Sequence, residues 1–237
     1  MRFTALIGGA LAAALALSTA ACDGSDDGGA PPAARATTRA TTNGIDKLDV
    51  TAILDRARTA TLAASSVHMS GAMPMDGGSM QIDVSFAGKA TSQGTITQGE
   101  QKFEFIRLDD AIYVKGNEAF LSDAAGGAAV SLLKDKYIKT SSKSKDFKDV
   151  EPLTDVTGMV GDIMTPTGTP TKGEITTVSG RRALELRDGG DSMYVALDGE
   201  PRVLRVKSDG DAILDLDRYG DPVQVTAPPA GQIVNIG

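Results

Sequence analysis

The chain has 237 residues, a formal net charge of −7 and a single cysteine, so an intramolecular disulfide framework is excluded. This acidic balance argues against nucleic-acid binding and against lying flat on an anionic bilayer. Aromatic residues make up only 4% of the chain and tryptophan is absent. Carbohydrate sites and aromatic cages are therefore disfavoured, because both rely on flat ring surfaces.

The first 21 residues have the composition of a secretory signal peptide. Met1 and Arg2 give a short positive start, residues 3–17 form an uncharged run rich in Ala and Leu, and small residues follow. The apolar run is too short to form a stable membrane span. Removing residues 1–21 takes away one Arg and no acid, so the formal charge changes from −7 to −8.

Cys22 follows this segment directly, and the segment before it resembles the bacterial lipobox. The resemblance implies that the thiol receives a diacylglyceryl group and that Cys22 becomes the new N-terminus. Two acyl chains, normally followed by a third, exceed what stable anchoring requires, so we expect an exported protein held on the outer face of the cell membrane. The alternative is a plain secreted protein with an unpaired thiol, which is unusual in an exported chain.

Residues 22–47 are predicted to be a flexible leash that begins at the lipidated cysteine. The stretch is rich in Asp, Gly, Pro and Thr and has no apolar periodicity. It cannot bury enough surface to offset its conformational entropy. We therefore expect a single folded domain over residues 48–237.

The folded part opens with a pattern typical of an amphipathic helix over residues 49–66. Asp49 lies near the positive N-terminal end of this helix. The apolar stripe at the 3.6-residue period consists of Ile53, Leu54, Ala57, Thr61 and Leu62.

The period then changes to two, which predicts strands with one buried face. Met80, Ile82, Val84 and Phe86 alternate with polar residues. Residues 91–116 are typical of a meander of short antiparallel strands, with turns at Gly99 and at Asp109 and Asp110. Apolar faces are expected to be formed by Phe103 with Phe105 and by Ile112 with Val114.

Residues 122–164 mix short helical stretches with polar breaks, and residues 165–170 are expected to form a loop. From Gly173 the strand pattern returns and continues to about Pro228. Turns of the Ser-Gly, Gly-Gly and Asp-Gly kind follow at about ten-residue spacing, which suits a meander. The order of elements predicts an α+β fold with a large antiparallel sheet.

This order of elements resembles the actinobacterial LppX/LprG-like lipoproteins, which are structurally similar to LolA and LolB. The resemblance rests on the lipobox cysteine, the leash, a helix ending in "SSVHMSGAM", the "AIYVKG" strand and the closing "SMYVALDGEPRVLRV". It implies a strongly curved antiparallel sheet, a half-barrel, with helices covering the concave face. It also implies a hydrophobic cavity for acyl chains between the sheet and the helices.

The candidate lining of that cavity is the set of alternating apolar residues on the predicted strands. An alternative hypothesis is that these residues simply pack a dry core. The set consists of Met80, Ile82, Val84, Phe86, Phe103, Phe105, Ile112, Val114, Met193, Val195 and Leu197.

Enzymatic function finds little support, and no cofactor is expected. His68 is the only histidine, so zinc-ligand spacing is absent and a Ser-His-Asp triad would have to use it, yet no Gly-x-Ser-x-Gly motif occurs. Asp215 and Asp217 alternate with leucines, as on the wet face of a strand. The acidic stretch lacks the EF-hand order of calcium ligands; its members are Asp209, Asp211, Asp215, Asp217 and Asp221.

Residues 134–149 form the one basic stretch, interleaved with three Asp residues. A solvated face is the expected role, and contact with lipid headgroups is the alternative. Two functions remain open. One is a membrane-anchored carrier of a lipid or other hydrophobic ligand, and the other is a ligand-free protein-interaction module anchored to the cell envelope.

Overall fold

The computed structural model describes residues 42–75, 78–144, 151–208 and 212–235. Cys22, the predicted signal peptide, most of the predicted leash, Asp209 and Asp211 lie outside these ranges. The described residues all belong to one compact unit.

The folded unit begins earlier than the predicted residue 48. Ile45 lies in a short 3-10 helix, η1 (Ile45–Lys47), and is almost fully buried. The Asn43 amide donates to the Leu197 carbonyl at 2.7 Å, and its side chain donates to the Ala196 carbonyl at 2.9 Å. The last residues assigned to the leash are therefore folded, because one apolar side chain and one asparagine connect them to the sheet.

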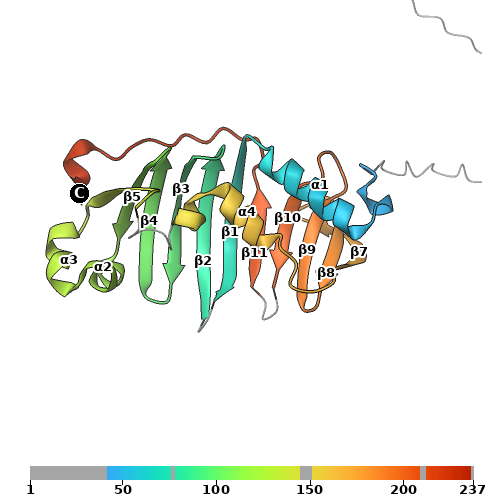
Figure 1. Ribbon diagram of the computed structural model, residues 1–237, viewed down its shortest axis with the longest axis horizontal. Coiled ribbons are helices and arrows are strands. Elements are labelled where there is room, and N and C mark those ends of the chain that lie inside the picture. Colours follow the sequence, from blue (N-terminus) through green and yellow to red (C-terminus); the bar gives the residue numbers. More distant parts are fainter. Residues whose placement is uncertain (1–41, 76–77, 145–150, 209–211, 236–237) are drawn as a thin grey trace, which may run out of the picture. The chain divides into compact units, whose positions relative to one another are not determined.

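Twelve strands of the described residues form one sheet (Figure 1). The first six in chain order are β1 (Ser66–Met75), β2 (Gly78–Ala87), β3 (Thr91–Gln98), β4 (Gln101–Leu108), β5 (Ala111–Gly116) and β6 (Tyr137–Ser141). The others are β7 (Thr171–Val178), β8 (Arg181–Asp188), β9 (Asp191–Ala196), β10 (Val203–Lys207), β11 (Ile213–Asp217) and β12 (Ile233–Asn235).

Two antiparallel meanders meet at the centre of the sheet. Strands β1 to β6 run outward in one direction, and β7 to β11 run back from the opposite edge until β11 pairs with β1. The four α-helices of the described residues are α1 (Val50–Leu62), α2 (Glu118–Ala125), α3 (Gly127–Leu133) and α4 (Val156–Ile163). Helix α4 and the loop after it carry the chain from the end of the first meander to the start of the second.

Residues 221–229 are not a strand, contrary to the sequence prediction. Pro222, Pro228 and Pro229 have no amide hydrogen for a ladder, and this segment has no regular structure. Figure 1 shows it running from the middle of the sheet to the β6 end, where β12 pairs with β6 in parallel. Strand β6 also differs from the expectation, because it lies in the stretch predicted to mix short helical stretches with polar breaks.

Strict alternation places one row of apolar side chains on the face covered by the helices, which we call the inner face. On β2 the buried residues are Met80, Ile82, Val84 and Phe86, as predicted. Val84 lies opposite Met69 on β1 and Gly94 on β3, which in turn lies opposite Phe105 on β4. These inner-face residues belong to one hydrophobic cluster with residues of α1 and α4.

Helix α1 begins as the sequence predicts. The Asp49 carboxylate accepts a hydrogen bond from the Ala52 amide at 2.9 Å, so it caps the N-terminus. Near the other end, the hydroxyl of Thr61 is fully buried and accepts a hydrogen bond from the Val203 amide at 3.1 Å. This contact fixes the helix against β10.

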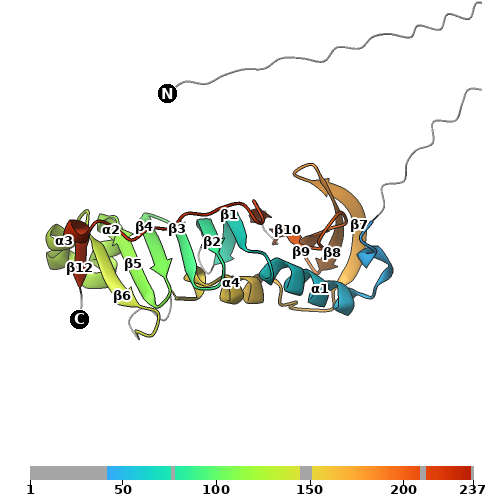
Figure 2. The ribbon, with the colours of Figure 1, turned by 90° about the horizontal axis from the view of Figure 1, so that it is seen from above.

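The observed architecture confirms the predicted α+β half-barrel, an open, curved and mostly antiparallel sheet with α1 and α4 packed across its inner face (Figures 1 and 2). Within the described ranges, no helix has the length and apolarity needed to span a bilayer.

Candidate functional site

A pocket of about 240 Å³ lies on the inner face, under the end of α4 and the loop that follows it. Its walls come from five strands of the sheet, from the end of α4 and from Leu54 of α1. The apolar side chains around it are Leu54, Met73, Ile163, Met164, Pro166, Pro170, Leu186, Met193, Val206 and Leu214.

The floor of the pocket is a cross-strand row. Leu186 on β8 lies opposite Met193 on β9, which lies opposite Val206 on β10. Val206 lies opposite Leu214 on β11, which pairs with Gly71 on β1. Because side chains alternate along each strand, one residue from each of four neighbouring strands is presented side by side.

Of the eleven predicted lining residues, Met193 lines this pocket. The other ten lie in the hydrophobic cluster between the sheet and the helices, each no more than 9% exposed, and they do not line it. A lining role for these ten stays a prediction. Alternation identifies the inner face but does not distinguish packed positions from open ones, so Leu186, Val206 and Leu214 were not singled out from the sequence.

The loop over the pocket is attached to the sheet by one carboxylate. Asp188 at the end of β8 accepts hydrogen bonds from the backbone amides of Thr167 and Gly168, both at 2.8 Å. Pro166 and Pro170 restrict the backbone before and after these two residues. We call residues 164–170 the lid loop.

Helix α4 is held above the sheet by a buried arginine on the inner face of β4, Arg107. Arg107 Nη1 lies 3.3 Å from Glu151 Oε1 and 3.4 Å from Asp155 Oδ2. Asp155 also caps α4, accepting a hydrogen bond from the Thr157 amide at 2.6 Å. Arg107 was not identified from the sequence. The available indication was that a charged residue follows Phe103 and Phe105 at the next inward-facing position of β4.

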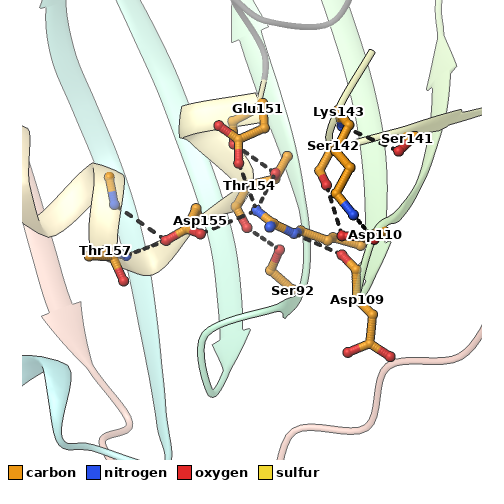
Figure 3. Close-up of polar contacts among 12 residues, drawn as sticks. Ser92, Asp109, Asp110, Ser141, Ser142, Lys143, Glu151, Thr154, Asp155 and Thr157 are labelled. Carbon is orange, nitrogen blue, oxygen red and sulfur yellow. Dashed lines mark hydrogen bonds and ion pairs between the residues drawn. The ribbon is translucent and has the colours of Figure 1, made fainter.

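A second polar anchor lies beside the first. The hydroxyl of Ser92 on β3 donates to the Thr154 carbonyl at 2.7 Å (Figure 3). Ser92 and Thr154 are both fully buried, in keeping with the rule that buried polar groups are paired. The two contacts set the position of α4, whose far end forms one wall of the pocket.

His68 lies on the outer face of the sheet between two carboxylates. Its Nδ1 is 2.8 Å from Asp217 Oδ1 and its Nε2 is 3.1 Å from Asp83 Oδ1. It therefore joins β11, β1 and β2, which agrees with the structural role expected of it.

The acidic stretch does not gather into a metal site where the structure describes it. Asp215 forms two hydrogen bonds with Arg205, at 2.6 and 2.9 Å, and Asp217 contacts His68. Across the described ranges, no group of three or more His, Cys, Asp or Glu side chains is placed to hold an ion.

The basic stretch is largely paired in its described part. Lys134 contacts Glu118 at 2.8 Å, and Lys143 contacts Asp110. Lys139 lies over the ring of Tyr113, 5.8 Å from its centroid. These pairs agree with a solvated face; residues 145–149 lie outside the described ranges.

A second hollow is polar and lies beside the turn between β3 and β4. It has a volume of about 670 Å³ and no apolar floor. Its lining residues are Gly78, Ser79, Gln81, Thr97, Gln98, Gly99, Gln101 and Asp123.

Known protein families and curated proteins provide no sequence match to this chain. Solved structures do. LprF from Mycobacterium bovis is 16% identical with a TM-score of 0.43, and the match covers 75% of this chain and 95% of LprF. The Mycobacterium tuberculosis lipoprotein LppX is 17% identical with a TM-score of 0.45, and the match covers 75% of this chain and all of LppX.

A LolA superfamily protein from Nitrosomonas europaea also matches, at 11% identity and a TM-score of 0.26, over 78% of this chain and 96% of that protein. LppX is one of the proteins after which the resembled family is named. Identities and TM-scores of this size carry no ligand or partner to the present chain.

Proposed function

We propose that this chain is an anchored carrier that holds the alkyl part of an amphiphile in the pocket under the lid loop. The observation that carries the proposal is the row of Leu186, Met193, Val206 and Leu214, which lines a volume of about 240 Å³. Such an apolar surface is stabilised when a tail replaces water on it.

The size of the pocket limits the ligand. Its volume of about 240 Å³ lies below the roughly 300–1,000 Å³ typical of sites for drug-sized ligands. A short tail, or the end of a longer one, is the appropriate occupant. At about 0.8 kcal/mol per methylene, burying six methylenes contributes about 5 kcal/mol before the costs of association.

The anchor extends the proposal to the membrane. An acylated Cys22 would hold the domain on the outer face of the cell membrane through the chain that precedes residue 42. The polar composition of residues 23–41 supports a tether rather than a folded connection. Tethering raises the effective concentration of the pocket near membrane amphiphiles.

The ligand-free interaction module is favoured by a different feature. Among the described strands, β7 pairs with β8 alone, and Ile175 on it is 52% exposed. An unpaired strand edge can accept a strand from another chain. A register shift between Lys172 and Ile175 disturbs that edge, which weighs against extended pairing.

The experiment uses the full chain with Cys22→Ser, which removes the anchor. The variant is purified without detergent, extracted with organic solvent, and the extract is analysed by mass spectrometry. The carrier proposal predicts a co-purified amphiphile at near-equal stoichiometry, or a rise in melting temperature when decanol is added to empty protein. A clean extract with no stabilisation by decanol would favour the interaction module.

The same variant also tests the lipid anchor, through the cell fraction in which the protein is found. Fractionation of cells should move the protein from the membrane fraction to the soluble fraction on Cys22→Ser. Retention of the variant in the membrane fraction would overturn the lipoprotein proposal while leaving the pocket untouched.

A further inference from the structure

Three of the residues that line the pocket are methionines. Met73 lies on β1, Met164 directly follows α4 and Met193 lies on β9. The thioether of methionine is flexible and polarisable, so it fits irregular apolar shapes. A peroxide can also oxidise it to a sulfoxide, which is polar. The methionines are therefore the lining residues whose polarity an oxidant can change.

The exposure of the methionines divides them into two groups. The structure describes the side chains of six methionines. Four of them are at most 6% exposed: Met69, Met80, Met159 and Met164. Met73 and Met193 are partly exposed, and both line the pocket. Because an oxidant must reach the sulfur, these two are the methionines of the described set that it should attack first.

Met193 lies in the middle of the pocket floor. Its cross-strand neighbours are Leu186 on β8 and Val206 on β10, and neither side chain can donate a hydrogen bond. Met73 packs against the same hydrophobic cluster. A sulfoxide oxygen in this floor would keep its hydrogen bonds to water only while no tail covers it. Covering it without a new partner costs free energy, so an alkyl tail should bind the oxidised floor weakly.

The oxidation is a two-electron transfer of one oxygen atom. The thioether sulfur attacks the O–O bond of a peroxide, an S–O bond forms as the O–O bond breaks, and the leaving oxygen takes up a proton. With hydrogen peroxide the products are a sulfoxide and water. Methionine sulfoxide reductases reverse the step. The sulfoxide oxygen then leaves as water while two thiols are oxidised to a disulfide.

We propose that Met73 and Met193 are an oxidation site that controls the pocket: peroxide converts them to sulfoxides, and the pocket releases its tail. This inference rests on the proposed function and adds its regulation. The four buried methionines stay reduced, so the domain keeps its fold and loses only its ligand. An anchored carrier would then unload where peroxide reaches it.

The test uses the full chain with Cys22→Ser, which has neither a thiol nor a tryptophan to consume the oxidant. Decanol binding is measured by calorimetry before and after treatment with hydrogen peroxide, and mass spectrometry of peptides locates each oxidised methionine. Met73 and Met193 should be oxidised before the four buried methionines. The dissociation constant should rise about tenfold or more, with an unchanged circular dichroism spectrum. Methionine sulfoxide reductases with dithiothreitol should restore the original constant.

Two double variants identify the sulfur atoms responsible, each protein being compared with itself before oxidation. Met73→Leu with Met193→Leu removes both pocket sulfurs and keeps an apolar side chain of similar volume. Its decanol binding should not respond to peroxide. Met80→Leu with Met159→Leu is the matched control, because it removes two buried sulfurs that do not line the pocket. Its binding should respond as the parent's does.

The outcomes separate this inference from the carrier proposal. Decanol binding that is undiminished once Met73 and Met193 are oxidised would overturn the inference and leave the carrier proposal in place. So would an equal loss of binding in Met73→Leu with Met193→Leu, oxidation of the buried methionines at the same rate, or unfolding of the oxidised protein. Failure of the untreated protein to bind decanol would overturn both.

Discussion

The carboxylate of Asp188 accepts a hydrogen bond from the backbone amide of Gly168, 2.8 Å away, and so joins the lid loop to the end of β8. Asp188 also accepts from the Thr167 amide at the same distance. A single side chain thus holds the loop closed over the pocket, and opening it requires breaking two charge-assisted hydrogen bonds.

Asp188→Ala should loosen the lid loop. Each lost hydrogen bond to a charged group contributes about 1.5–3 kcal/mol at most, and less here because the site is half exposed, so the domain should still fold. Stopped-flow exchange of a bound alkyl probe should become faster in both directions, and proteolysis within residues 165–169 should increase. Thr167→Val, which keeps both amide contacts, is the control. Unchanged exchange in Asp188→Ala would show that the loop is not the gate.

Arg107→Met should lower stability and disturb the pocket from a distance. The substitution leaves Glu151 and Asp155 without their cation over the sheet, and it removes the contact that positions α4. Because both carboxylates are partly exposed, a loss of about 2–3 kcal/mol in the free energy of unfolding is expected rather than the full value for a buried pair. Urea denaturation measures it.

The control for Arg107→Met is Lys143→Met, which breaks the exposed pair with Asp110. A surface pair contributes about 0–1 kcal/mol, so this variant should unfold close to the parent. Equal effects of the two substitutions would contradict the structural role given to Arg107.

Gly71→Ala should be strongly destabilising. Gly71 has a φ of +135°, and a Cβ there would lie 2.0 Å from the Ile213 carbonyl oxygen on β11. The atoms that would clash are backbone atoms of Ile213 and Leu214, which cannot move without disturbing the pairing of β1 with β11. We therefore expect the free energy of unfolding to fall by about 3 kcal/mol or more. Gly88→Ala separates the effect of a positive φ from the effect of the steric clash, because Gly88 also has a positive φ but has open space around it. For this variant we expect the free energy of unfolding to fall by about 1 kcal/mol. Similar melting temperatures for the two variants would refute the close approach of β1 and β11.

Glu185→Gln should make stability less dependent on pH. Burial raises the pKa of the Glu185 carboxyl, but hydrogen bonds from Arg187, Ser192 and the Glu174 amide outweigh it, so the net pKa is below its ordinary value of 4.5. A depressed pKa means that ionised Glu185 stabilises the fold above about pH 4.5 and that this contribution is lost as the pH falls through the folded-state pKa.

We therefore expect Glu185→Gln to be less stable than the parent by about 1–2 kcal/mol at pH 7 and to approach it below pH 4. Urea denaturation at pH 7, 5, 4 and 3 measures the difference. Glu200→Gln, at an exposed turn, should follow the parent at every pH. A gap between Glu185→Gln and the parent that widens in acid would reverse the assigned sign.

The sequence predicted those features that depend on local periodicity. The buried face of β2 and the alternation of Leu214 and Leu216 with Asp215 and Asp217 are as expected, because a strand with one wet face leaves a period of two in its sequence. The Asp49 cap is likewise a local signal.

Features that depend on distant pairing were missed. The parallel pairing of β12 with β6 joins residues almost a hundred positions apart, and the proline-rich segment before β12 gives no hint of its partner. Ile45 was assigned to the leash because a single apolar residue in a polar stretch has no periodicity. The position of the pocket was also missed, because it depends on where α4 ends relative to the row that contains Met193 and Val206.

The central claim is that the space beside Met193 binds an alkyl tail, and Met193→Trp tests it most directly. The indole should fill the pocket, whereas Ile175→Trp adds the same bulk on exposed β7 and should have no effect. Decanol binding to both Cys22→Ser proteins is measured by calorimetry, with circular dichroism confirming that each is folded. The account predicts loss of binding in Met193→Trp alone; undiminished decanol binding by a folded Met193→Trp protein would contradict it.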